Sequence, residues 1–363
     1  MAYIVSVVVP TKNRYQYLKH LVKMVHNFNL PELELVIQDN SDNNDEILKF
    51  LEQYSSDSIK YYYSSKSLTM SQNGELAIRN SNGKYVCYIG DDDGICRNIV
   101  ECAKWMEKNN IPAAFNNNVS FLWGKMVKFR NPYKGYKIRY SKKEMNSLLL
   151  NGMNLLQTNM PLIYHGIVRK DILKDIVKKY GTLFPSVPPD ISGSICLASV
   201  IDSYCELYTP VIINGASSMT GGGVIAKGGV LPLEEISFIT HKDIEKWGNQ
   251  IPPIWCGNYA WAVSGVNTLE HIGRKDLIPK FNKDSCLASA ISTRPNKQIL
   301  WKLGWDYADS KFEFCLLILT KLIKKYLKKI KNNLPLRVRK NYRVLTIEDA
   351  EKFLIEVSDM NML

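Results

Sequence analysis

Short apolar runs alternate with helix-period patterns through the first 115 residues of the chain. This alternation is typical of β-α-β units built on a mainly parallel sheet. The apolar, β-branched runs predict strands at 3–9, 33–37, 59–63 and 85–89, with a weaker one near 113–116, and the intervening patterns predict helices at 16–27, 45–54, 71–81 and 99–108. The N-terminal part is therefore expected to be an α/β fold.

The pattern changes twice further along the chain. Residues 121–215 are mixed, with an aromatic and basic stretch up to Tyr140, a strand expected at 162–168 and a helix opening after Pro188-Pro189-Asp190. The glycines between 221 and 229 predict a mobile loop, because ordering many glycines is entropically costly. Beyond residue 233 the pattern is helical, and we expect helices at 234–247, 258–272, 285–293, 297–305, 311–332 and 347–359. The chain thus divides into an α/β domain at 1–232 and a helical C-terminal region at 233–363.

Length, charge and cysteine spacing narrow the class of protein. The 363 residues correspond to about two folded units. Ten basic residues and no acidic residue lie between 321 and 343, so most of the net charge of +12 sits at one end of the chain and favours an anionic surface as partner.

The apolar run at 3–9 ends at Pro10 and resembles no secretory signal, and no run is long enough to span a membrane. Eight cysteines without a C-x-x-C pair indicate reduced thiols in a cytoplasmic protein without a zinc site.

Polar loops follow three of the predicted strands, at 10–14, 38–42 and 90–94. In an open parallel sheet, ligands bind beyond the carboxyl ends of the strands, so these loops are expected to share one edge. None carries the glycine pattern of a dinucleotide-binding or P-loop enzyme. Their carboxylates would repel a phosphate unless a hard cation such as Mg²⁺ or Mn²⁺ bridged the two, which predicts a nucleoside diphosphate held through a metal. Each acidic segment alone could instead be an ordinary turn or helix cap.

The motifs at 4–14, 36–42, Asn73 and 83–93 resemble, in order and spacing, the successive motifs of family 2 glycosyltransferases with the GT-A fold. The segments 164–169 and 188–191 resemble acceptor-side segments of bacterial polysaccharide members of that family. Lys12 departs from the aromatic residue frequent there, and the Q-x-x-R-W motif of processive synthases is absent. The resemblance therefore implies transfer of single sugars rather than polymerisation.

The resemblance also implies roles for individual residues. Asp39 would meet the nucleotide base, while Pro10, Thr11 and Arg14 would line the nucleotide cleft. Asn73 and the acidic triplet would complete the nucleotide site, with Asp91 near the ribose, Asp92 beside it, and Asp91 and Asp93 forming the D-x-D pair that binds Mn²⁺ or Mg²⁺.

Family 2 members invert the anomeric centre, so a carboxylate must take the proton of the acceptor hydroxyl. Asp190 is the candidate, since Pro-Pro fixes the backbone before it; a plain helix N-cap is the alternative role. Asp202 and Glu206 are alternative bases, but their positions inside a predicted helix favour a solvated face. His165 is better interpreted as a structural histidine. Three further aromatic residues could stack on acceptor sugars, although their helical spacing favours the core: Trp255, Tyr259 and Trp261.

The predicted helix at 311–332 is basic and amphipathic. Apolar residues recur at helical spacing from Leu316 to Ile330, and lysines occupy 321, 324, 325, 328 and 329. Such a helix can lie in the interface of an anionic membrane, so residues 316–343 are expected to contact one. The alternatives are a helix packed on its own protein and a nucleic-acid-binding arm; the few aromatics argue against nucleic acid.

Together these expectations describe a cytoplasmic, metal-dependent, inverting glycosyltransferase on the inner face of the cell membrane. It would move one hexosyl or N-acetylhexosaminyl group from a nucleoside-diphosphate sugar, with UDP as the expected carrier, to a glycan or polyprenyl-linked acceptor in bacterial O-antigen or capsule synthesis. The rivals are a nucleotidyltransferase that makes nucleotide sugars and a basic nucleic-acid-binding protein with an inactive α/β body. The sequence does not determine the oligomeric state.

Overall fold

The computed structural model describes residues 3–130, 135–218, 230–236, 238–293, 296–333 and 339–357. An eight-stranded sheet lies at its centre, in the order β3-β2-β1-β4-β10-β6-β11-β9. Its first half is parallel, as the sequence predicts, and comprises β1 (Val5–Thr11), β2 (Leu33–Asp39), β3 (Ile59–Tyr63) and β4 (Tyr85–Tyr88). The other half is mixed, with β6 (Ala113–Phe115), β9 (Tyr136–Tyr140), β10 (Gly166–Arg169) and β11 (Ser203–Leu207).

The helices predicted between the first strands are present. They are α1 (Tyr15–Phe28), α2 (Asp45–Leu51), α3 (Met70–Asn80) and α4 (Ile99–Lys108). The apolar positions of α1 recur every three or four residues, so Leu18, Leu21 and Val25 turn together into the core. A capping box between Thr69 and Gln72 begins α3. These connections bring the carboxyl ends of β1, β2 and β4 to the same edge of the sheet.

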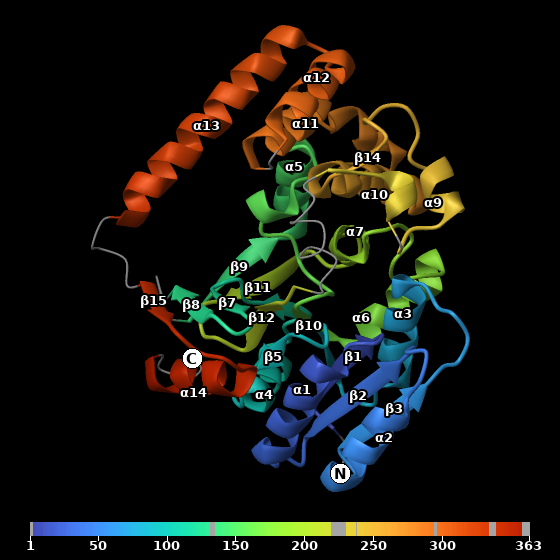
Figure 1. Cartoon of the computed structure of the whole chain (residues 1–363), viewed down its shortest axis with the longest axis vertical. Coiled ribbons are helices and arrows are strands. Elements are labelled where there is room, and N and C mark those ends of the chain that lie inside the picture. Colours follow the sequence, from blue (N-terminus) through green and yellow to red (C-terminus); the bar gives the residue numbers. More distant parts are fainter. Residues whose placement is uncertain are drawn as a thin grey trace.

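A second sheet, in the order β15-β8-β7-β12-β5, was not predicted. Its strands are short: β5 (Gly94–Ile95), β7 (Val119–Leu122), β8 (Met126–Arg130), β12 (Ile212–Ala216) and β15 (Arg339–Tyr342). After β15, helix α14 (Ile347–Val357) packs Ile347, Ala350 and Leu354 into the core shared with α1. The last described segment of the chain therefore returns to the α/β body, although the sequence pattern placed it with the C-terminal helices (Figure 1).

Most of the remaining helices gather at one end of the molecule, above the sheet in Figure 1. They are α5 (Ser141–Leu150), α7 (Pro189–Ala198), α9 (His241–Glu245), α10 (Gly257–His271), α11 (Lys283–Thr293), α12 (Lys297–Tyr307) and α13 (Lys311–Asn333), with a small hairpin of β13 (Leu231–Pro232) and β14 (Ile254–Trp255). Helix α6 (Lys170–Tyr180) follows β10 and lies beside α3 in Figure 1. The helices predicted from 258 onwards are confirmed. The single helix predicted at 234–247 is wrong, because a capping box at Thr240 and Asp243 starts a new, short helix there. The glycine-rich loop predicted at 221–229 lies outside the described residues.

The sheet buries different clusters on its two faces. Val5, Val7 and Val9 of β1 pack with α1, α4 and α14. Val8 of the same strand belongs to a cluster that continues through α3, α7, α10 and α11 as far as Ile318 of α13. Because successive side chains of a strand alternate between faces, one strand anchors both clusters. The helical end therefore shares a continuous core with the sheet instead of forming a separate body.

Candidate active site

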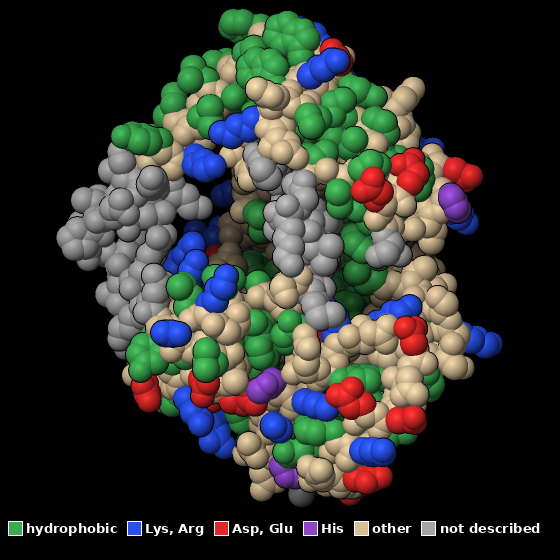
Figure 2. Space-filling model, viewed as in Figure 1, with side chains coloured by type: hydrophobic (Ala, Val, Ile, Leu, Met, Phe, Trp, Pro, Cys, Tyr) green, Lys and Arg blue, Asp and Glu red, His purple; other side chains and the backbone are tan. Residues whose placement is uncertain are grey.

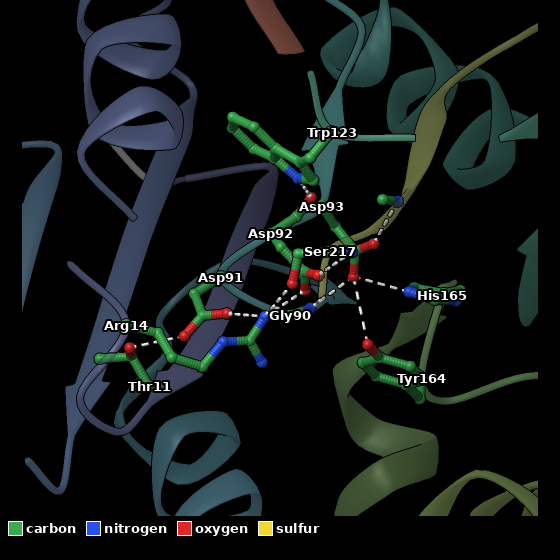
Figure 3. A network of polar contacts seen from close by, with 11 residues as sticks. Thr11, Arg14, Gly90, Asp91, Asp92, Asp93, Trp123, Tyr164, His165 and Ser217 are labelled. Carbon is green, nitrogen blue, oxygen red and sulfur yellow. Dashed lines mark hydrogen bonds and ion pairs between the residues drawn. The ribbon is translucent and has the colours of Figure 1, made fainter. Parts of the chain in front are cut away.

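The loops after β1 and β4 meet at the carboxyl edge of the sheet, as the sequence predicts (Figure 3). The Thr11 hydroxyl donates a hydrogen bond to Asp91 Oδ2 at 2.7 Å. The Arg14 guanidinium lies between two carboxylates, with Nη2 at 3.0 Å from Asp91 Oδ1 and 2.9 Å from Asp92 Oδ1. One cation thus holds two buried acids of the triplet in place.

Asp93 is fully buried and anchored from several directions. Its Oδ2 accepts hydrogen bonds from the Gly90 backbone N–H at 2.7 Å, from His165 Nε2 at 2.6 Å and from the Tyr164 hydroxyl at 3.3 Å. Its Oδ1 accepts from the Gly215 backbone N–H at 2.7 Å. The carboxylate therefore ties the acidic loop to β12 and to the segment before β10 (Figure 3).

Several partners of the triplet carried no sequence signal. The Ser217 backbone N–H donates to Asp92 Oδ2 at 3.1 Å, and the indole N–H of Trp123 donates to the Asp92 carbonyl at 2.7 Å. Gly215 packs so closely that a Cβ there would lie 1.7 Å from the Asp92 carbonyl oxygen. These residues lie in or directly after strands of the unpredicted second sheet, so no local sequence pattern connects them with the triplet.

Burial and neighbouring charges raise the pKa values of three groups at this edge: Asp91, Asp92 and His165. Burial raises the pKa of Asp91 to about 7, even though Arg14 lowers it. Burial, together with the charge of Asp93, also raises the pKa of Asp92. Burial alone would lower the pKa of His165, but the attraction of Asp93 outweighs it and the pKa lies above the ordinary value. The site thus concentrates negative charge that a ligand-borne cation or an added metal would relieve.

The other two predicted nucleotide residues are buried in the loops beside the triplet. Asp39 Oδ2 accepts hydrogen bonds from the hydroxyls of Tyr15 and Tyr61, each at 2.7 Å, and Oδ1 accepts from the Ser41 N–H at 2.8 Å. The Asn73 amide donates to the Thr11 carbonyl at 3.3 Å, and its Oδ1 is buried with no partner in the described chain. Asn73 therefore has an unsatisfied acceptor, whereas Asp39 has both oxygens engaged.

A pocket with a volume of about 340 Å³ brings the predicted cleft residues and the predicted base together. Pro10, Arg14, Asp91 and Asp92 line it from the sheet edge, and Asp190 lines it from α7. Its remaining lining is largely apolar or aromatic: Met70, Tyr88, Gly90, Tyr164, Val187, Pro188, Pro189, Phe238, Trp255, Gly257, Ala260 and Trp261. Thr11, Asp39, Asn73 and Asp93 are not among the lining residues.

Asp190 does not cap its helix. The N-cap of α7 is Pro188, with Pro189 at the first helical position, and no side-chain capping bond is present. Asp190 Oδ1 accepts only the neighbouring Ile191 N–H at 2.8 Å, and Oδ2 accepts the indole N–H of Trp261 at 3.0 Å. Burial raises the pKa of Asp190, which the Trp261 hydrogen bond partly offsets. The N-cap alternative is wrong, and the carboxylate is turned toward the C-terminal helices.

The other candidates for the base are placed elsewhere. Asp202 is exposed in the turn before β11, and Glu206 lies on β11 and pairs with Arg139, so the helix predicted to contain them ends earlier, at Ala198. Trp255 and Tyr259 are buried in the core, as their spacing indicates. Trp261 is only half-buried and reaches the pocket, which its helical spacing did not predict.

The residues fit a divalent cation in part. Asp91 Oδ1 is buried and accepts no hydrogen bond, but it is ion-paired with Arg14 Nη2 at 3.0 Å, so a bound cation would compete with Arg14 for it. Asp93 as placed has both oxygens occupied by protein donors. Within the described ranges, His, Cys, Asp and Glu side chains form no group of three that could hold a metal ion.

The parallel sheet with an acidic loop after β4 and a pocket at its carboxyl edge defines a nucleotide-binding α/β protein of the GT-A type. Residues 6–160 match the Glycosyl transferase family 2 description. The match covers less than half of the chain and makes residues 6–160 similar to that family; it ends before Asp190, so it includes the sheet edge but not the far wall of the pocket.

No curated protein matches the chain. Among solved structures, it is similar to residues 1–349 of S. aureus TarS in complex with UDP-GlcNAc, with a TM-score of 0.48 and 14% identity over 89% of each chain. The same fragment without that ligand gives a TM-score of 0.43 and 15% identity over 89% of this chain and 88% of that one. The mannosyltransferase PcManGT from Pyrobaculum calidifontis, in complex with GDP-Man and Mn²⁺, gives 0.39 and 14% identity over 92% of this chain and 89% of that one.

Proposed function

We propose that the protein is an inverting glycosyltransferase that moves one sugar from a nucleoside-diphosphate sugar to an acceptor hydroxyl. The observation that carries this proposal is the single pocket that Arg14, Asp91 and Asp92 line on one side and Asp190 lines on another. A donor bound at the sheet edge would present its anomeric carbon to an acceptor beside Asp190. We infer a hexosyl or N-acetylhexosaminyl donor carried by UDP.

On the donor side, Arg14 is the residue suited to the diphosphate. Its guanidinium now neutralises Asp91 and Asp92, and it lies in the pocket wall. We propose that Asp91 and Asp92 contact the ribose side of the nucleotide, with Pro10, Thr11, Asp39 and Asn73 shaping the nucleoside cleft. The unsatisfied Asn73 Oδ1 supports a polar ligand near the end of β1.

A bound Mg²⁺ or Mn²⁺ would offset the negative charge of the leaving diphosphate. Asp91 Oδ1 accepts no hydrogen bond and pairs only with the Arg14 guanidinium, which supports Asp91 as one ligand. The resemblance implies Asp93 as the second ligand. Both oxygens of Asp93 accept hydrogen bonds from protein donors.

In the transfer step, the acceptor oxygen forms a bond to the anomeric carbon while the bond from that carbon to the diphosphate oxygen breaks. The acceptor proton passes to Asp190, whose burial-raised pKa makes it a stronger base than an exposed aspartate. The electron pair of the broken bond leaves with the nucleoside diphosphate. Attack from the side opposite the leaving group inverts the anomeric configuration.

The experiment that tests this function is a panel of nucleotide sugars with Mn²⁺ or Mg²⁺ and a set of glycan acceptors. Release of a nucleoside diphosphate that depends on the acceptor, together with a product of inverted configuration by NMR, is expected. A nucleotidyltransferase would instead release pyrophosphate from a nucleoside triphosphate and a sugar phosphate, and that result would overturn the proposal.

We further propose that the enzyme works at the inner face of the cell membrane on a glycan or polyprenyl-linked acceptor of a bacterial surface polysaccharide, O-antigen or capsule. None of the helices in the described part of the chain is long and apolar enough to cross a membrane, so α13 would have to lie along the surface. Hydrophobic side chains gather over α12 and α13 at the top and upper left of Figure 2.

Helix α13 has two apolar faces. Phe314 and Ile318 are buried against the neighbouring helices. The opposite face leaves large side chains exposed by 50% or more: Phe312, Leu316, Leu319, Ile323, Tyr326 and Leu327. Lys324 is exposed beside this face, whereas Lys325 donates a hydrogen bond to the Ser292 carbonyl at 2.9 Å. An exposed apolar face with adjacent cations supports attachment to an anionic lipid surface.

A further inference from the structure

Two tryptophans of the C-terminal region line the pocket, and their indole N–H groups differ. Trp261 Nε1 donates to Asp190 Oδ2 at 3.0 Å. Trp255 Nε1 is buried and has no partner in the described chain. We propose that Trp261 is a positioning residue: its N–H fixes the Asp190 carboxylate and favours the ionised form that can accept the acceptor's proton. The proposal rests on the function proposed above, in which Asp190 is the base.

The carboxylate is held from two independent elements. Oδ1 accepts from the Ile191 N–H within α7, and Oδ2 accepts from Trp261 of α10. Each carboxylate oxygen has two lone pairs, so Oδ2 can take a proton from a substrate while Trp261 remains bound. Without Trp261 only the bond to the adjacent backbone N–H would remain, and the side chain would turn more freely about its own χ angles.

A hydrogen bond to the charged form of an acid lowers its pKa. Burial raises the pKa of Asp190, and the Trp261 bond is the largest effect opposing that rise, ahead of the Ile191 N–H and His165. The other charged groups that line the same pocket are Arg14, Asp91 and Asp92 from the sheet edge. They are unchanged by a substitution at 261, so a shift in the ionisation of Asp190 can be assigned to the lost N–H.

Trp261→Phe removes the donor and keeps an aromatic ring. We expect the acidic limb of the kcat/KM profile to move to higher pH, with a loss on the order of tenfold on that limb and a smaller loss on the alkaline plateau. Trp255→Phe is the matched control, because it alters the other pocket tryptophan without removing a bond to Asp190; its acidic limb should not move.

A second variant keeps the test decisive if Trp261→Phe folds poorly. Replacing the Trp261 indole by its benzothiophene isostere, which carries sulfur in place of N–H, preserves the shape of the side chain. The same movement of the acidic limb in this protein, at an unchanged melting temperature, supports the proposal. An unmoved limb in the isostere, or an equal loss at every pH, overturns it.

Asp190→Asn separates this inference from the function on which it rests. If that variant retains wild-type turnover, the proposed base and the role of Trp261 both fail. If it loses turnover but Trp261→Phe leaves the acidic limb in place, only the inference about Trp261 fails. If Trp261 acts through Asp190, Trp261→Phe should have little further effect in the Asp190→Asn background.

Discussion

The proposed donor side and the proposed acceptor side of the pocket are built in different ways. The proposed donor side comes from loops that follow β1 and β4, which are neighbours in the sheet, and its main residues lie at 10–14 and 90–93. The acceptor side is assembled from α7, β14 and α10, whose contributions are spread from Val187 to Trp261. A nucleotide site can therefore be encoded in short local motifs, whereas the opposing wall depends on how distant helices pack.

The two sides also differ in their polar contacts. The acidic triplet is held by a network that includes Thr11, Arg14, His165 and the Gly215 backbone (Figure 3). Asp190 has one neighbouring backbone donor and one indole, within a largely apolar wall. The donor side is thus suited to hold a charged ligand in a fixed place, and the acceptor side presents one base to a sugar hydroxyl.

Asp93→Asn should disrupt nucleotide binding at the donor side, and its loss of activity is the largest effect that we expect. It removes a charge from the triplet, so we expect transfer to be abolished and Mn²⁺-dependent UDP binding to be weakened, which titration calorimetry would measure. Gly90 and Gly215 donate to different oxygens of Asp93, and asparagine keeps an acceptor for only one of them, so circular dichroism and a melting curve must accompany the activity assay. Asp57→Asn, at an exposed position, is the charge-matched control. Unchanged turnover and metal dependence would remove the triplet from the active site.

A variant of α13 tests whether membrane attachment is separate from both sides of the pocket. It replaces four lysines by Glu: Lys324, Lys325, Lys328 and Lys329. We expect the variant to move from anionic vesicles to the soluble fraction in a sedimentation assay, because like charges then repel the lipid surface. Activity on a water-soluble acceptor should persist, since the pocket residues lie in other elements.

The matched control for this variant reverses four exposed lysines outside α13: Lys142, Lys143, Lys178 and Lys179. It carries the same change in net charge and should still sediment with anionic vesicles. If the α13 variant also sediments at low salt, or if wild type binds neutral vesicles equally well, electrostatic attachment through α13 is wrong.

Asp91→Asn should have the smallest effect, a change in melting temperature. It tests whether burial raises the pKa of this carboxyl group at the donor side. Burial raises the pKa of Asp91 from 3.8 to about 7, so its ionisation lowers the stability of the fold as pH rises through that interval. The neutral variant avoids this loss. We expect its melting temperature to exceed that of wild type by about 2–4 °C at pH 8, with no gain at pH 4. Equal differences at both pH values would contradict the raised pKa.

The sequence predicts the meeting of the loops at the sheet edge well because the information for it is local. Period-two apolar runs define β1, β2 and β4, and the polar breaks after them identify the loops that meet at Asp91. Parallel pairing then fixes these loops at one edge without further information.

The acceptor side and the second sheet could not be predicted in the same way. Asp190 was identified from the Pro-Pro before it, but the bond from Trp261 spans 71 residues and has no periodic signature. The short strands β5, β7 and β12 depend on pairings between distant segments, so Gly215 and Ser217 could not be connected with the triplet. The return of α14 to the sheet likewise depends on tertiary packing.

The most direct test of a pocket with separate donor and acceptor sides compares donor affinity with turnover in Asp190→Asn. If Asp190 is the base, turnover should fall by the ~10² to 10⁴ typical of general-base loss, while the affinity for the donor nucleotide with Mn²⁺ stays within about twofold of wild type. Loss of donor binding together with a lowered melting temperature would contradict the account, because Asp190 would then support the structure of the pocket and not the chemistry.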